Sequence, residues 1–147
     1  MSLAAASAIG ANATALNQPL QVSASHTTVP KSIRGTWYCY DGKYKGKRHY
    51  SKYLFTKHYR YVNDFFQGKR SHYRERLDVY RDSHRGWYGI NSTKKEVGMP
   101  ALYRYSPLTI RGIKHRSLQV REGTTSFRMF RTMVLHNYQK FQISAWY

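Results

Sequence analysis

Short runs rich in aromatic and β-branched residues recur along this chain, separated by polar turn residues. Within several runs, apolar and polar positions alternate one by one, as in a strand with one buried face. Glycine, proline, asparagine, aspartate and serine separate the runs at short intervals, which favours antiparallel strands. We therefore predict strands near residues 36–40, 52–62, 73–80, 87–90, 102–105, 108–114, 117–121, 127–135 and 141–146. This pattern predicts an all-β fold, a small antiparallel barrel, closed or nearly closed, of about eight or nine strands.

The longest of these runs, Lys52 to Val62, bears on function through its orientation. If this run is one strand, one of its faces carries Tyr53, Phe55, Tyr59 and Tyr61, and only Lys57 interrupts that face. We interpret these aromatic residues as core. Nucleic-acid binding needs aromatic rings exposed beside cations, so this orientation argues against it. The preceding residues, Lys43 to His49, lack alternation and are predicted to form a mobile, exposed cationic loop.

Residues 72–80 admit a second interpretation. Tyr73, Leu77 and Tyr80 also fall at helical spacing, and arginine, glutamate and leucine are good helix formers. A strand and a helix both remain open here, and either leaves the rest of the barrel unchanged.

The segment VPKSIRGTWYCYD, Val29 to Asp41, carries the most specific signal in the chain. Pro30 favours a short N-terminal helical turn before the first strand. Gly35 has no Cβ to obstruct close approach of another group. We predict that Trp37 then points inward to plug one end of the barrel, with Cys39 on the same face of the strand.

The Gly35-x-Trp37 pattern resembles the lipocalin-type signature. The longer run Pro-Lys-Ser-Ile-Arg-Gly-Thr-Trp-Tyr resembles the opening of a family of small, uncharacterised secreted proteins of lactic-acid and related Gram-positive bacteria. That resemblance implies a signal peptide, export and a lipocalin-like barrel. Two positions differ from the expected pattern: Ile33 stands where leucine is usual, and the sequence assigns no arginine to the closing strand, where lipocalins pack one over the tryptophan.

The charge distribution divides the chain near residue 30. Met1 to Pro30 contain no Lys, Arg, Asp or Glu, and residues 3–15 are small and apolar with two Ala-x-Ala patterns, as at a signal-peptidase site. We predict that residues 1–29 are a signal-peptide remnant and disordered linker, with a plain disordered start as the alternative. A single domain then spans residues 30–147. The predicted location is extracellular and associated with the cell wall, and no transmembrane segment is expected.

A formal net charge of +18 makes a polyanion the expected partner. The candidate binding residues form two groups of Lys and Arg: first Lys43, Lys45, Lys47, Arg48, Lys69, Arg70 and Arg74, and second Lys94, Lys95, Lys114 and Arg116. We favour an anionic cell-wall polymer, teichoic acid above all, with nucleic-acid binding or metal-independent nuclease activity as the alternative. The barrel either holds a small apolar ligand or is filled by its own side chains. A monomer is expected.

The sequence contains few candidate catalytic or metal-binding residues. Glu75 and Asp78 would pair on a helix but fall on opposite faces of a strand, and neighbouring arginines suggest ion pairs. The seven histidines form no metal-binding spacing, so we expect no metal and no cofactor. Cys39 is the only cysteine, which excludes an intramolecular disulfide and suggests a small buried residue. We favour a non-enzymatic role and keep enzymatic activity as the alternative.

Overall fold

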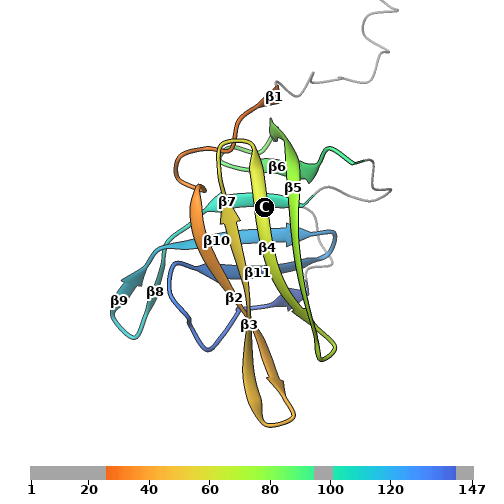
Figure 1. The fold of residues 1–147 in the computed structure, drawn as a ribbon. Coiled ribbons are helices and arrows are strands. Elements are labelled where there is room, and N and C mark those ends of the chain that lie inside the picture. Colours follow the sequence, from red (N-terminus) through yellow and green to blue (C-terminus); the bar gives the residue numbers. More distant parts are fainter. Residues whose placement is uncertain (1–25, 95–100, 142–147) are drawn as a thin grey trace, which may run out of the picture.

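The computed structural model of the protein describes residues 26–94 and 101–141, and its regular elements there are all β-strands (Figure 1). They are β1 (His26–Thr27), β2 (Gly35–Tyr44), β3 (Lys47–Phe55), β4 (Tyr59–Phe66), β5 (Lys69–Arg81), β6 (Tyr88–Ser92), β7 (Leu102–Tyr105), β8 (Leu108–Ile110), β9 (Ile113–His115), β10 (Ser117–Glu122), β11 (Thr125–Phe130) and β12 (Lys140–Phe141). The proposed signal segment, Lys95 and the strand expected beyond Phe141 lie outside the described residues.

Eight of these strands close into an antiparallel barrel, which confirms the predicted fold class. Their order is β2, β3, β4, β5, β6, β7, β10 and β11, and β11 returns to pair with β2. Strands β2 to β5 run across β7, β10 and β11, so the two halves of the barrel pack face to face with crossed strands (Figure 1). Strand β12 extends the sheet beside β11, and β8 and β9 form a separate hairpin where one continuous strand was expected.

Strand β5 links the two halves because it is long enough to pair with both. Its residues 69–76 pair with β4, and its residues 77–81 pair with β6. Strand β1 covers the opposite edge of β5 at Val79 and Tyr80. Val29, just before Pro30, is fully buried in the core and packs with the barrel residues. Residues 72–80 are therefore strand, and the helical alternative is wrong.

Two tight hairpins project from one end of the barrel. Lys45–Gly46 joins β2 to β3 and Gln67–Gly68 joins β4 to β5, and all four residues have φ between 47° and 79°. Positive φ at both central residues is the turn geometry whose twist matches paired strands, and glycine adopts it without steric cost. The expected mobile loop over Lys43–His49 is thus a paired hairpin. Alternation is missing there because both faces of the hairpin meet solvent.

The run from Lys52 to Val62 is two strands, not one. The chain reverses at residues 56–58, where the Thr56 N–H donates to the Tyr59 carbonyl at 2.8 Å and the Tyr59 N–H donates to Thr56 Oγ1 at 3.0 Å. Phe55 faces inward as expected, with 1% of its surface exposed. The reversal shifts the alternation, so Tyr61 faces outward and is 42% exposed. The interruption at Lys57 was the sign of this turn.

Trp37 occupies the barrel interior as predicted, fully buried, and its indole N–H donates to the Ile33 carbonyl at 2.6 Å. That carbonyl follows a single hydrogen-bonded turn, in which the Ile33 and Arg34 N–H groups both donate to the Pro30 carbonyl. Cys39 lies in the same core cluster and is buried, as the sequence suggested.

An arginine packs over the tryptophan, although the sequence did not identify one. The Arg131 guanidinium lies 3.7 Å from the Trp37 ring centroid and donates to the carbonyls of Arg34 at 2.6 Å and Thr36 at 3.1 Å. A Cβ at Gly35 would lie 2.3 Å from Arg131 Nη1, so only glycine leaves room for this group. Gly35, Trp37 and Arg131 therefore meet at one place in the fold.

The closure between β2 and β11 is the narrowest junction in the barrel. One pair of residues, Tyr38 and Phe130, is in register across it. Asn137 fills the gap beyond this pair, because its side chain donates to the Tyr40 carbonyl at 3.1 Å and its own carbonyl accepts the Arg128 N–H at 2.7 Å. Side chains from the segment after β11 therefore hold the barrel closed where the strand ladder is short.

A charged pair fills part of the interior. Arg60 of β4 binds the Glu75 carboxylate of β5 and donates to the Tyr103 hydroxyl of β7 at 2.9 Å. Both charged side chains are about 85% removed from solvent, and the Phe55 ring lies 5.5 Å from Tyr103 and 6.0 Å from the Arg60 guanidinium. Polar and aromatic side chains of β3, β4, β5 and β7 therefore meet inside the barrel at this level.

Candidate polyanion-binding surface

The turns of the β2–β3 and β4–β5 hairpins touch each other at one end of the barrel. The Tyr44 ring packs on Gly68, where a Cβ would lie 2.6 Å from the ring. The His49 and Phe65 rings stack in parallel with centroids 3.7 Å apart, and Tyr44 meets Phe65 edge-on at 5.8 Å. Aromatic contacts between the two hairpins thus hold their tips in a fixed relation.

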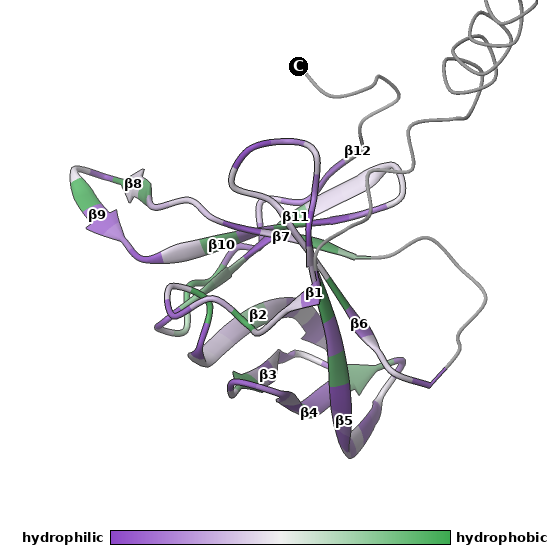
Figure 2. Cartoon of the chain, turned by 90° about the horizontal axis from the view of Figure 1, so that it is seen from above, coloured by the Kyte–Doolittle hydropathy of each residue, from purple (hydrophilic) through white to green (hydrophobic). Residues whose placement is uncertain are grey.

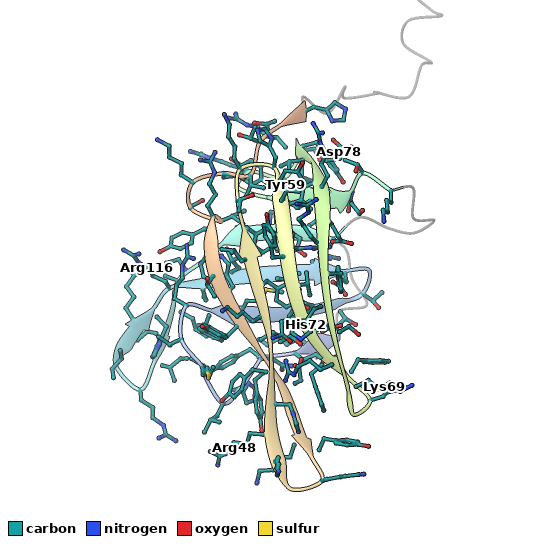
Figure 3. The ribbon with its side chains drawn as sticks, in the orientation of Figure 1. Arg48, Tyr59, Lys69, His72, Asp78 and Arg116 are labelled. Atoms are coloured by element: carbon teal, nitrogen blue, oxygen red, sulfur yellow. The ribbon has the colours of Figure 1, made fainter. Side chains whose placement is uncertain are left out.

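Six of the seven cations in the first predicted group gather at this end, and all six are exposed. We call them the basic tip: Lys43, Lys45, Lys47, Arg48, Lys69 and Arg70. Figure 3 shows Arg48 and Lys69 at the same end of the molecule, one from each hairpin. The predicted group is therefore largely one surface. Arg74 lies further along β5, beyond the tip.

Within the basic tip, Arg70 is held and the lysines extend into solvent. The Arg70 guanidinium donates to Asn63 Oδ1 at 2.7 Å and to the Tyr50 carbonyl at 3.2 Å, and it lies 5.4 Å from the Phe65 ring centroid. Lys45 Nζ lies 5.6 Å from the Tyr44 ring centroid. The tip therefore combines one guanidinium held by hydrogen bonds with exposed ammonium groups, which suits a polymer without a fixed conformation.

The second predicted group is not a single surface. Lys114 and Arg116 lie on and just after β9, and Lys94 follows β6 on the opposite side of the barrel (Figures 1 and 2). Figure 3 places Arg116 far from Arg48 and Lys69. The fourth member, Lys95, lies outside the described residues. The sequence grouped these residues by their charge, but the fold places them on different sides of the barrel.

The outer face of β3, β4 and β5 forms an open groove that sequence reasoning missed. Two cross-strand rows line it: Leu54, Tyr61 and Arg74, and Lys52, Asn63 and His72. Its volume is about 510 Å³. The Arg74 guanidinium lies 5.1 Å from the ring centroid of Tyr59, the next outward aromatic on β4. We call this surface the outer groove.

Beneath the basic tip, two carboxyl groups share one hydroxyl. Ser51 Oγ is fully buried, lies 2.6 Å from Asp41 Oδ2 and 2.8 Å from Asp64 Oδ1, and accepts the Phe65 N–H at 3.0 Å. A hydroxyl has a single hydrogen to donate, so contact with both carboxyl groups requires a proton on one of them. Burial raises the pKa of Asp41 to about 6, and the nearby Asp64 charge raises it further against the opposing Ser51 hydrogen bond. Protonation of Asp41 below about pH 6 therefore removes one negative charge from beneath the basic tip.

Three further acidic side chains, Glu75, Asp78 and Asp82, each lie against one basic or imidazole side chain. Asp78 lies 2.7 Å from His26 Nδ1, so neither it nor Glu75 pairs with a neighbouring arginine of its own strand. Asp82 lies 2.7 Å from His84 Nδ1. Within residues 26–94 and 101–141, no cluster of three or more His, Cys, Asp or Glu side chains is placed to hold a metal ion.

In the same described ranges there is no helix whose length and apolar character would let it cross a membrane. Comparisons of the chain with protein-family models, with curated proteins and with solved structures found no match.

Proposed function

We propose that the protein is a non-enzymatic β-barrel that acts outside the cell by binding phosphate-bearing polyanions through the basic tip. The observation that carries this proposal is the gathering of six exposed cations from two hairpins at one end of the barrel. Anionic wall polymers such as teichoic acid and nucleic acids share the required phosphodiester chemistry. The extracellular location rests on the Ala-x-Ala patterns and on the resemblance of the opening segment to secreted proteins.

Binding of this kind derives from counterion release. Each phosphate that a Lys or Arg neutralises frees a condensed counterion, so the affinity falls as salt rises. Six contacts predict a slope of about −4 for log affinity against log salt with a flexible single-stranded polymer. The interaction carries no sequence information by itself, which suits a protein that is retained on a polymer surface.

The test compares two variants with the same loss of charge. Lys47→Gln with Lys69→Gln removes one cation from each hairpin of the tip, and Lys94→Gln with Lys114→Gln removes two cations elsewhere. Binding is measured at several salt concentrations to inorganic polyphosphate and to Gram-positive walls with and without teichoic acid. We expect the tip variant to bind more weakly, with a slope shallower by about 1, and the control to match wild type.

Equal losses in the two variants, or binding insensitive to salt, would contradict a role for the tip. Loss of wall binding on removal of teichoic acid would identify the wall polymer as a target, while retained binding would exclude it. The same samples, incubated with nucleic acid and examined for polymer length, test the non-enzymatic part of the proposal: shortened strands would overturn it.

A further inference from the structure

We propose that the outer groove binds the bases of single-stranded nucleic acid, with the phosphates passing along its cationic margin to the basic tip. This inference rests on the proposed function, because it takes a phosphate polymer as the ligand and names its class. Three features of the groove carry it: exposed rings, cations on both sides of them, and the spacing between outward positions.

The first feature is the exposed aromatic and apolar surface of the groove. Tyr61 of β4 is 42% exposed and lies in register between Leu54 of β3, 36% exposed, and Arg74 of β5. A strand in a sheet usually exposes polar side chains on its solvent face, so an adjoining tyrosine and leucine form an apolar floor that water covers poorly. A planar base would stack on the ring and cover the leucine, whatever its sequence.

Cations flank this floor on both sides. Lys52 of β3 lies beside Asn63 of β4, and Arg74 of β5 lies beside Tyr61, so positive groups stand on either side of the central strand. Among the described outward positions of β3 to β5 between residues 50 and 76, no acidic side chain interrupts the charge. Glu75 points into the barrel, where it pairs with Arg60.

The spacing favours a single strand over a duplex. Outward residues of a strand recur about every 6.8 Å, twice the 3.4 Å axial rise between stacked bases of a duplex. A nucleic acid that follows β4 must therefore have its bases drawn apart, which a single strand allows and a duplex resists. Arg70, the next outward position of β5 after His72, leads from the groove to the hairpin turn and belongs to the basic tip. Its guanidinium donates to Asn63 Oδ1 at 2.7 Å, so the cationic margin of the groove continues into the tip.

A wall polymer of alternating phosphate and polyol groups offers no planar face. It would gain from the cations of the groove and not from its aromatic floor, so charge alone leaves the exposed tyrosine unexplained. Single-stranded nucleic acid uses both parts of the surface at once. This difference separates the two polymer classes experimentally.

The experiment measures binding of the full chain to a fluorescent single-stranded oligonucleotide, to the matching duplex and to inorganic polyphosphate. The variants are Tyr61→Ala, Tyr61→Phe and, as a control, Tyr105→Ala, which removes a tyrosine of 37% exposure on β7, outside the groove. We expect Tyr61→Ala to weaken oligonucleotide binding about 5- to 100-fold and to leave polyphosphate binding unchanged. Tyr61→Phe keeps the ring and should bind like wild type, as should Tyr105→Ala.

The outcomes separate this inference from the proposed function. If oligonucleotide and polyphosphate bind alike and Tyr61→Ala changes neither, the outer groove does not stack bases, while phosphate binding by the tip stands. If none of the polymers binds, the proposed function fails as well. Tighter binding of the duplex than of the single strand would overturn the strand argument. Thermal denaturation of each variant shows whether the fold is kept.

Discussion

Replacement of Arg131 by alanine should destabilise the barrel far more than the loss of a typical surface arginine. The side chain donates two hydrogen bonds to carbonyls of the segment before β2 and at its start, and it covers the face of Trp37. Each charge-assisted bond contributes about 1 kcal/mol at a partly exposed site, and the cation–π contact about 1 kcal/mol. The expected loss is therefore about 3 kcal/mol, or about 10–15 °C in melting temperature for a domain of this size.

The assay is urea unfolding followed by tryptophan fluorescence, with Arg131→Ala, Arg131→Lys and the exposed Arg85→Ala as control. Lysine keeps the charge but cannot donate to both carbonyls from one planar group, so Arg131→Lys should lie between alanine and wild type. Arg85→Ala should change the free energy of unfolding by less than about 0.5 kcal/mol. If Arg131→Ala falls within about 1 kcal/mol of wild type, or if Arg131→Lys equals wild type, the two hydrogen bonds and the ring contact of Arg131 do not stabilise the barrel.

Two further predictions concern titratable groups near the tip and in the core. Because the folded-state pKa of Asp41 is raised from 3.8 to about 6, its protonation stabilises the fold below pH 4, and this contribution is lost as pH rises through about 6. Asp41→Asn should therefore gain stability relative to wild type between pH 4 and 6 in parallel denaturation curves, and a constant difference would refute the shared proton with Asp64. Burial, aided by the Asp41 and Asp64 charges, raises the pKa of Cys39 to about 12, so the native thiol should not react with an aromatic disulfide reagent at pH 8 until denaturant is added. Rapid reaction of the native protein would show that the thiol is accessible.

The sequence predicted those parts of the molecule that local chemistry determines. The strand class, the buried Trp37 and the close approach at Gly35 follow from residue types and their immediate order. The reversal after Phe55 was missed because its turn contains no glycine, proline or asparagine and lies inside an alternating run. That single omission placed Tyr61 in the core instead of on the outer groove, since one reversal changes the face of every later residue.

Contacts between residues far apart in the sequence could not be predicted from local residue patterns. Arg131 meets residues nearly one hundred positions away, and nothing in its own neighbourhood marks it among the many arginines of the chain. The basic tip was identified in large part because two glycine-containing turns carry its cations close together in sequence. Lys94 and Lys114 met the same compositional criterion, but the strands between them lead to opposite sides of the barrel.

The short junction between β2 and β11 also affects where the native protein undergoes local unfolding. Among the described residues, only Tyr38 and Phe130 are paired there, so amide hydrogens near this junction are protected by few ladder bonds. Local opening, which exchanges amide hydrogens without global unfolding, should therefore begin at the junction, away from the longer pairings of β4 with β5. The Asn137 hydrogen bond to Tyr40 and the contact of the Arg131 guanidinium with Trp37 oppose that opening. A barrel closed by side chains can open along one line while the surface formed by β3, β4 and β5 stays intact.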